Sequence, residues 1–187
     1  MAFSTLEIDV REVEHLAQLF KLAEQKAPAA IARAVRRTGD MTATRVVRSL
    51  TAQTGLKRPV IVRAVKKKPA GMTYSLLTRG GNVHLKYFKP RETRKGVSAA
   101  PWNQRHVFAG TFTKGGLFPK RVPLNLGGQV YKRSGASRTP IASQRSGLFI
   151  PKEMISGATR AEFLNSVRTI LPPRLAHEIA AILGGHA

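Results

Sequence analysis

Residues 86–105 read KYFKPRETRKGVSAAPWNQR and lie at the centre of the most basic part of this 187-residue chain. From Met41 to Lys152 the sequence holds 23 Lys and Arg residues and one acid, Glu92, which gives this segment a formal charge of +22. The two flanking segments hold nine basic and nine acidic residues and are neutral. Like charges at this density repel one another unless an anionic group lies beside them. The segment therefore predicts an anionic partner.

Charge alone leaves three kinds of partner open: a nucleic acid backbone, an acidic protein surface or a membrane surface. No window approaches the roughly 18 consecutive apolar residues of a membrane span, and the acidic start MAFSTLEIDVREVEHL is unlike a secretory signal. We therefore expect no membrane partner. Aromatic residues make up only 6% of the chain, which argues against a surface that stacks the bases of a single strand.

The length and the 42% hydrophobic content are sufficient for one domain with a buried core, and we predict a single domain over residues 1–187. The chain has no cysteine, which excludes disulfides and thiolate metal sites. The predicted class is α+β: an N-terminal strand, two to three helices, a central antiparallel β-sheet with long basic loops, and a C-terminal helix.

The N-terminal third alternates first with a period of two and then with a helical period. Phe3–Val10 predicts a half-buried strand, and residues 11–26 predict an amphipathic helix. Pro28 is placed to start a second helix over residues 29–53, and Gly39 indicates a bend or a close packing contact within it. The residues that lie near one stripe of this helix are Ile31, Val35, Met41 with Thr42, Val46 and Leu50. Residues 56–68 predict a third helix with a strongly basic outer face.

Beyond Pro69 the sequence is typical of strands and turns. Strands are predicted at residues 72–79, 83–88, 105–112 and 129–132, with Gly80-Gly81 as the turn of a hairpin between the first two. The glycine- and proline-containing segment 113–128 predicts a mobile loop or arm. A last helix is predicted over residues 158–170 with a Thr159/Glu162 capping box, interrupted at Pro172-Pro173 and resumed over 174–183.

The residues needed for catalysis or metal binding are scarce. The five histidines occur singly, with no HxxxH or HExxH spacing, and Glu92 alone cannot form a carboxylate pair or a two-metal site. No double glycine is followed by the GK[ST] of a phosphate-binding loop, and no GxSxG is present. We predict no enzymatic activity, no cofactor, no metal and no small-molecule substrate.

The order of several basic phrases resembles a known family. TGLKRPVIVRAVKKKPAG is followed by HLKYFKPRETRKGVSAAPWNQR, then by VYKRSGASRTPI and a closing helix near Leu183. This combination resembles the prophage minor tail protein Z family of tailed phages, over about residues 27–183, although no single motif is specific. The resemblance implies a tail-completion-like domain, a structural virion protein at the head-proximal end of the tail that supports head-tail joining. It implies no catalytic residues.

The resemblance also implies location and partners. The protein is expected in the tail or neck region of the virion, assembled in the bacterial host cytoplasm, as a ring of copies of itself, with six as the common number. The other expected partners are tail terminator, tail tube or neck proteins, with DNA phosphates as a further candidate. The interaction surface is predicted from the basic residues Lys57, Arg58, Arg63, Lys66, Lys67, Lys68, Lys86, Lys89, Arg91, Arg94, Lys95, Arg105, Lys132, Arg133 and Arg138.

A second class of protein fits the same composition. A sequence pI near 11.6 is typical of a protein that binds nucleic acid without reading its sequence, such as a ribosomal or nucleoid-like protein. No recognised RNA- or DNA-binding module supports this alternative.

Overall fold

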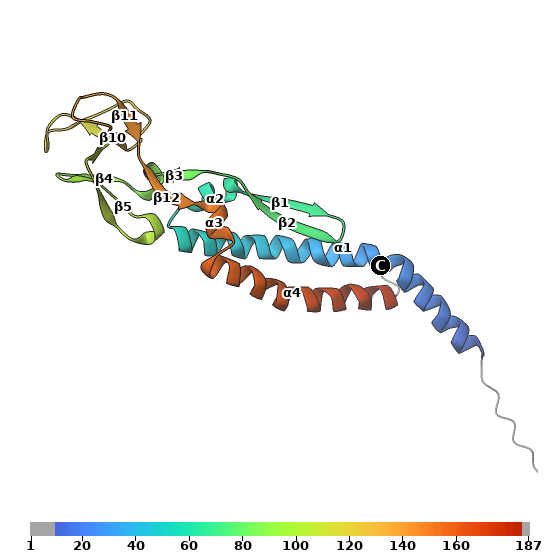
Figure 1. Ribbon diagram of the computed structural model, residues 1–187. Helices are drawn as coiled ribbons and strands as arrows, with labels where there is room; N and C mark the ends of the chain where they lie inside the picture. Colours follow the sequence, from blue (N-terminus) through green and yellow to red (C-terminus); the bar gives the residue numbers. More distant parts are fainter. Residues whose placement is uncertain (1–9, 185–187) are drawn as a thin grey trace, which may run out of the picture. The chain divides into compact units, whose positions relative to one another are not determined.

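The computed structural model describes residues 10–184, which form helices and several small antiparallel sheets (Figure 1). The predicted α+β class is confirmed, with helical segments at both ends of the described chain. The α-helices are α1 (Val10–Thr54), α2 (Arg58–Ala64), α3 (Ile150–Met154) and α4 (Gly157–Leu183). Two short 3-10 helices are η1 (Leu85–Phe88) and η2 (Pro101–Asn103).

The strands are short, and in the described part of the chain five small sheets stand in place of the predicted central sheet. They are β1 (Val65–Ala70), β2 (Thr73–Thr78), β3 (Asn82–His84), β4 (Arg91–Thr93), β5 (Gly96–Ala99), β6 (His106–Ala109), β7 (Thr111–Phe112), β8 (Lys114–Gly115), β9 (Val122–Pro123), β10 (Tyr131–Arg133), β11 (Ile141–Ser143) and β12 (Arg145–Phe149). The strand orders are β1-β2, β11-β10-β7, β12-β3, β4-β5-β6 and β8-β9.

The chain forms two compact units. The first, here the helical unit, comprises Met1–Met41, Pro69–Ser75 and Val167–Ala187. The second, here the β-rich unit, comprises Thr42–Lys68 and Leu76–Ser166. The chain passes between the units within α1, β1, β2 and α4. The prediction of a single domain stays a prediction.

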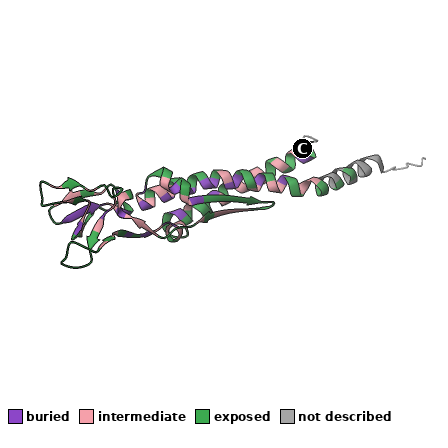
Figure 2. Cartoon of the chain, turned by 90° about the horizontal axis from the view of Figure 1, so that it is seen from above, coloured by how far each residue is buried: buried purple, intermediate pink, exposed green. Residues whose placement is uncertain are grey.

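In the helical unit, the first part of α1 and the last part of α4 contact each other in antiparallel directions. Arg33 Nε donates to Glu178 Oε2 at 2.7 Å, and Arg174 Nη2 lies 3.8 Å from the sulfur of Met41. Ala30 and Ala34 are buried on α1, and Figure 2 shows how buried and exposed residues alternate along this helix. Small side chains on the buried side allow helices to approach closely.

The β-rich unit holds the main apolar core. Twelve buried hydrophobic residues form one cluster, to which α1 contributes Leu50, α2 contributes Ile61 and η1 contributes Leu85 and Phe88. Strand β5 contributes Val97 and Ala99, and it pairs with β4 on one side and β6 on the other. Its burial on every residue fits a central strand covered on both faces. This core fixes the β4-β5 hairpin, which carries Arg94 and Lys95.

Pro28 does not separate two helices, contrary to the prediction, because α1 continues through it to Thr54. Likewise α4 runs through Pro172 and Pro173 to Leu183. A proline inside a helix removes one backbone hydrogen bond and costs about 3 kcal/mol. Ala30 is buried soon after Pro28, and the buried residues Ile170 and Ile182 flank Pro172 and Pro173. We infer that packing of the continued helix offsets this cost.

The predicted helix over 56–68 is wrong in its second half. Helix α2 ends at Ala64, since Val65 is extended, with φ −88° and ψ 116°, and Lys66, Lys67 and Lys68 lie on strand β1. Strand β1 pairs with β2, which confirms the predicted strand at 72–79. Pairing with β2 outweighs the helical spacing of the apolar residues in this segment.

The hairpin predicted at Gly80-Gly81 is also wrong. Strand β2 pairs with β1, whereas β3 pairs with β12, so that His84 lies opposite Arg145 and Asn82 opposite Phe149. Residues 85–88 form η1 instead of continuing the predicted strand. The segment 113–128 contains the short β8-β9 pair, and its mobility stays a prediction. The strand predicted over Phe3–Val10 falls outside the described residues apart from Val10, where α1 begins.

The predicted capping box at Thr159 is wrong because α4 begins two residues earlier, at Gly157. The side chain of Gln53, on α1, takes the place of a cap. Gln53 Oε1 accepts from the Thr159 amide at 2.9 Å and from the Thr159 hydroxyl at 2.8 Å, while Glu162 Oε1 accepts from Ser166. The start of α4 is therefore held by a residue more than a hundred positions away in the sequence.

Candidate interaction surface

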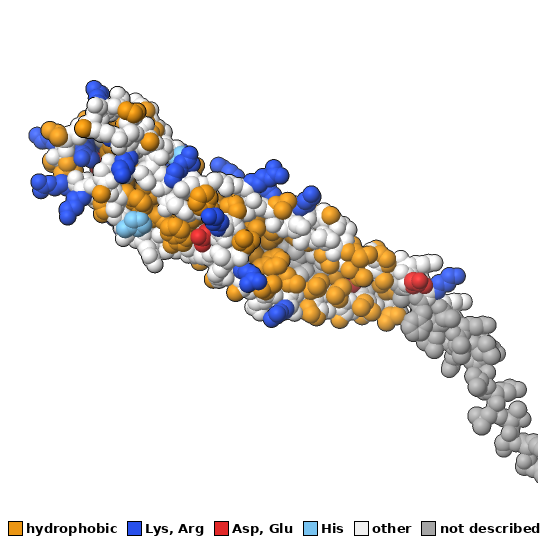
Figure 3. All heavy atoms as spheres, in the orientation of Figure 1, with side chains coloured by type: hydrophobic (Ala, Val, Ile, Leu, Met, Phe, Trp, Pro, Cys, Tyr) orange, Lys and Arg blue, Asp and Glu red, His pale blue; other side chains and the backbone are white. Residues whose placement is uncertain are grey.

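The two compact units differ sharply in charge. The β-rich unit contains 24 Lys and Arg residues and three acids, Glu92, Glu153 and Glu162, whereas the helical unit contains eight basic and seven acidic residues. Nearly the whole net charge of +22 thus belongs to the β-rich unit. The face of the strand region in Figure 3 carries Lys and Arg side chains with few carboxylates among them.

The basic residues predicted to form the interaction surface all lie in the β-rich unit. Fourteen of the fifteen are exposed, and Lys86 is half-buried. They lie at or next to α2, β1, η1, the β4-β5 hairpin, the start of β6, and strand β10 with the loop that follows it. Because their charged groups stay hydrated at the surface, these cations are stable without a partner and remain accessible to one.

Arg94 and Lys95 occupy the turn between β4 and β5. The turn is closed by the Thr93 hydroxyl, which donates to Gly96 O at 2.7 Å, and by the Gly110 amide, which donates to Lys95 O at 3.2 Å. Gly96 has φ +150°, and a Cβ there would lie 2.1 Å from Phe108 O. Only glycine allows β5 and β6 to approach this closely. The hairpin therefore presents both cations from a fixed backbone.

Arg105 differs from the other predicted residues because its guanidinium is bonded within the unit. Nη1 donates to the backbone and hydroxyl oxygens of Ser98, both at 3.2 Å, and Nη2 donates to Lys89 O at 3.3 Å. These bonds tie the segment before β6 to β5 and to the residue after η1. We therefore assign Arg105 a structural role alongside its place in the predicted surface.

Glu92, the single acid of the basic segment, is engaged by two partners. It accepts hydrogen bonds from the amide of Thr113 at 3.0 Å, from the Thr113 hydroxyl and from Arg121 Nη1, with which it also forms a salt bridge. Burial acts to raise the pKa of Glu92, but these hydrogen bonds and the charge of Arg121 lower it below its ordinary value. Glu92 thus attaches the segment around β8 and β9 to strand β4.

A pocket of about 280 Å³ lies between the β4-β5 turn and the β7 to β9 segment. No carboxylate of the described residues lines the pocket. Five of its lining residues are cationic: Arg94, Lys95, Lys114, Arg121 and Arg133. The remaining side chains at the wall are those of Thr111, Phe112 and Leu117. The pocket is suited to an anionic group.

Three of the five pocket cations belong to the predicted surface, namely Arg94, Lys95 and Arg133. Lys114 and Arg121 were not predicted, because the sequence of 113–128 indicated only a loop. Among the predicted residues, the pocket does not include those of α2, β1 or η1. The predicted surface is therefore spread over several elements, and three of its residues line this pocket.

The cationic surroundings also affect a histidine. His84 Nδ1 lies 2.9 Å from the hydroxyl of Ser143, and burial, followed by the charges of Arg145 and Lys86, lowers the pKa of His84 below its ordinary value. At neutral pH its ring is uncharged. Among the side chains that the structure describes, no three His, Asp or Glu residues gather as a metal site would require, and no helix of the described residues has the length and apolar content to cross a membrane.

No protein-family model matches the chain, and no match was found among curated proteins or among solved structures.

Proposed function

We propose that this protein is a structural component of a phage virion, which completes the head-proximal end of the tail and supports head-tail joining. The observation that carries the proposal is the concentration of charge in the β-rich unit, with 24 basic residues against three acids and the predicted cations exposed. Such a unit needs an acidic neighbour to offset its repulsion. The ordered phrases that resemble the minor tail protein Z family are the reason for placing that neighbour in a tail.

Neighbouring tail or neck proteins are the proposed main partners, with DNA phosphates touched by part of the surface at most. A ring of about six copies would bring together six highly basic units, and charges within the screening length of about 8 to 10 Å would oppose its closure. Acidic faces of protein neighbours offset this repulsion. The exposed apolar residues Leu117 and Val122 beside the cations also favour a protein surface over a phosphate backbone.

The direct test is to delete the gene from a phage that encodes this chain and to examine the particles by electron microscopy. The proposal expects filled heads and separate tails that fail to join, and restoration of joined particles when the chain is supplied from a plasmid. It also expects the chain to copurify with finished particles. Normal particles without the chain, or finished particles that do not contain it, contradict the proposal.

The alternative is a protein that binds nucleic acid without sequence preference, and the same charge concentration favours it. The purified chain would then bind duplex DNA with an affinity whose logarithm falls with the logarithm of salt concentration, at about −0.9 per phosphate neutralised. Steep salt dependence, together with absence of the chain from particles, would favour the alternative. Incorporation into particles with weak DNA binding would favour the tail component.

A further inference from the structure

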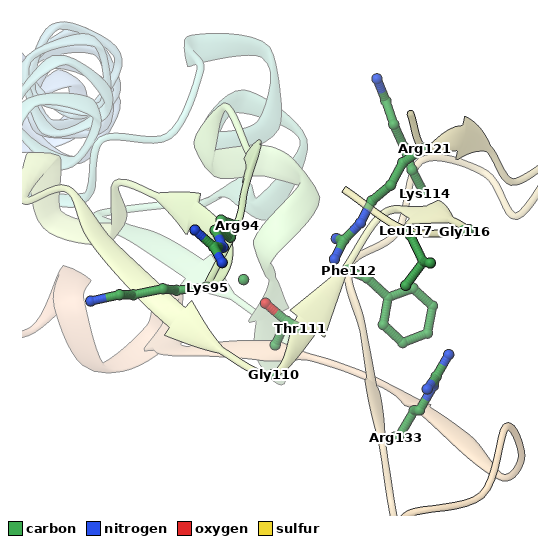
Figure 4. A pocket seen from close by; sticks show the side chains of 12 residues that line it. Arg94, Lys95, Gly110, Thr111, Phe112, Lys114, Gly116, Leu117, Arg121 and Arg133 are labelled. Carbon is green, nitrogen blue, oxygen red and sulfur yellow. The ribbon is translucent and has the colours of Figure 1, made fainter. Parts of the chain in front are cut away.

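The cationic pocket has features of a built binding site. Figure 4 shows Arg94 and Lys95 on one side and Phe112, Leu117 and Arg121 on the other, with Thr111 between them and the Arg133 side chain directed toward the Phe112 ring. The guanidinium of Arg133 lies 5.6 Å from the centre of that ring. This cation-π contact orients Arg133 without neutralising it.

Arg121, which lines this pocket, carries a buried donor without a partner in the described part of the chain. Glu92 engages Nη1, but Nε is buried and has no hydrogen-bond partner among the described residues, and the side chain as a whole is only 19% exposed. A buried donor without an acceptor is costly. None of the described residues forms a salt bridge with Arg94, Lys95 or Lys114 either. The described residues therefore give these three cations no carboxylate partner, and a carboxylate from outside would supply one.

The rim of the pocket is apolar and indicates a peptide as the occupant. Leu117, which lines the pocket, is 87% exposed, and Phe118 and Val122 of the same β8-β9 hairpin are exposed as well. A DNA backbone offers phosphates and sugars to a protein and interfaces with it are strongly polar. Carboxylates that alternate with aliphatic side chains would use both the cations and the apolar rim.

A segment of that composition is present in this chain. Residues 6–14 read LEIDVREVE and contain four of the ten acids of the protein, Glu7, Asp9, Glu12 and Glu14, interspersed with aliphatic residues and one arginine. We propose that the acidic N-terminal segment of one copy binds the cationic pocket of a second copy. This inference rests on the proposed function, because a ring requires a contact that repeats from copy to copy.

The contact would also reduce the electrostatic cost of assembly. Each copy would bring a net negative segment against the basic unit of its neighbour, so that every junction pairs opposite charges. Since the segment and the pocket are different surfaces, the contact is heterologous and can propagate around a ring. The carboxylates of Glu7 and Asp9 are the proposed ligands of the pocket.

The first experiment measures binding of a fluorescent peptide of residues 3–14 to the full chain by anisotropy. Binding should weaken at least about tenfold in R94E/K95E, and equally when the peptide carries Glu7→Lys and Asp9→Lys. The matched control is R48E/R79E, which makes the same charge change on exposed residues of the same unit outside the pocket. A scrambled peptide of equal charge should bind weakly. Equal losses in both protein variants would overturn the proposal.

The second experiment uses only full-length chains. Chains with E7K/D9K and chains with R94E/K95E should each fail to self-associate in analytical ultracentrifugation, whereas their mixture should form a one-to-one complex through the intact segment of one and the intact pocket of the other. A chain that carries all four reversals should associate again. A mixture that stays monomeric, as would follow from a segment bound only within its own chain, overturns the proposal.

Two results separate this inference from the proposed function. If R94E/K95E abolishes peptide binding but deletion of the gene leaves particle joining normal, the docking is supported and the tail function fails. If R94E/K95E blocks joining but leaves peptide binding unchanged, the tail function stands and the docking is overturned. Loss of duplex DNA binding in R94E/K95E, with no peptide binding by the unmodified chain, would make the pocket a phosphate site and also overturn the docking.

Discussion

Gly39 on α1 faces the ring of Tyr74 on β2 so closely that a Cβ at position 39 would lie 2.2 Å from Tyr74 Cγ. Two carbon atoms that are not bonded to each other cannot lie that close, so a side chain at position 39 would force the ring to move. The sequence indicated a bend or a close packing contact at Gly39, and the structure confirms the close contact. The missing side chain is therefore what allows β2 to lie against this helix within the helical unit.

Gly39→Ala should destabilise the protein by about 1 to 3 kcal/mol, since overpacking outweighs the gain of roughly 1 kcal/mol from replacing a helical glycine. Urea denaturation measures the change. The matched control is Gly80→Ala, where nothing lies within 4 Å of the added Cβ and the effect should be neutral or slightly stabilising. A stabilised Gly39→Ala variant would contradict the close contact.

Tyr74→Phe should change how stability depends on alkaline pH. The Tyr74 hydroxyl donates to Asp40 Oδ1 at 2.8 Å, and burial together with Asp40 raises the pKa of Tyr74 to about 12. A raised pKa stabilises the fold fully below the unfolded value near 10, and this contribution is lost as the pH rises through about 12. The variant should be less stable at pH 8 by about 1 to 2 kcal/mol. The difference from the unmodified chain should shrink above pH 10; a constant difference would contradict this assignment.

Glu92→Gln should destabilise the protein at neutral pH by about 1 to 3 kcal/mol, because it removes a charge that accepts from Thr113 and Arg121. The lowered pKa of Glu92 means that its contribution is present above the unfolded value of about 4.3. It is lost as the pH falls through the folded pKa. The difference between variant and unmodified chain should therefore vanish in acid.

Glu162→Gln is the control for this carboxylate. Its salt bridge with Arg45 spans 3.9 Å, and both side chains are at least 34% exposed. Glutamine keeps an oxygen that can accept from the Ser166 hydroxyl, so the expected change is within about 0.5 kcal/mol. Chemical denaturation from pH 7 down to acid measures both variants. A variant of Glu92 no weaker than that of Glu162 would contradict the role given to Glu92.

Gln53→Ala should destabilise the β-rich unit by about 2 kcal/mol, since Thr159 is fully buried and would lose the acceptor of its amide and hydroxyl. The variant would also lose the bond from Gln53 Nε2 to Glu153 Oε2 at 2.7 Å. Gln104→Ala, at an exposed position, is the control. Hydrogen exchange at the first turn of α4 should increase in Gln53→Ala only.

Reversal of Arg91, Arg94 and Lys95 to Glu should leave the chain folded but block assembly, because all three are exposed on the β4-β5 hairpin. Circular dichroism and the melting temperature should change little, while joined particles should be lost in complementation of the deletion phage. R48E/R79E/R160E applies the same charge change at other exposed positions and should assemble. Normal particles with the hairpin variant would exclude this hairpin as an interface.

The parts of the fold that follow from local sequence pattern could be predicted. Of the predicted helical stripe, Thr42, Val46 and Leu50 are buried on α1, whereas Met41 is exposed. The β-formers of residues 73–78 form β2. The pairing of the strands could not be predicted. Strand β3 pairs with β12, some sixty residues further along the chain, and the sequence of neither strand indicates its partner. The continuity of helices through Pro28 and Pro172 depends on packing, which a local rule does not include.

Some residues of the candidate site could be predicted from the sequence, and others could not. Charge density was enough to single out Arg94, Lys95 and Arg133, and it showed that Glu92 was unusual. The position of Arg121 in the pocket depends on the Glu92 bond and on two-residue strands, which are too short to leave a period in the sequence. The pocket exists because the β4-β5 and β8-β9 hairpins meet beside strands β7 and β10, and composition alone cannot predict that arrangement.

The four passages of the chain between its compact units, each within a helix or strand, determine which experiments can be interpreted. No single truncation separates the near-neutral part from the cationic part, since any cut also severs an element that the remaining part needs. A loss of function in an expressed fragment would therefore reflect misfolding and would not show that the missing part has that function. Dissection of this protein must proceed by surface substitutions in the intact chain.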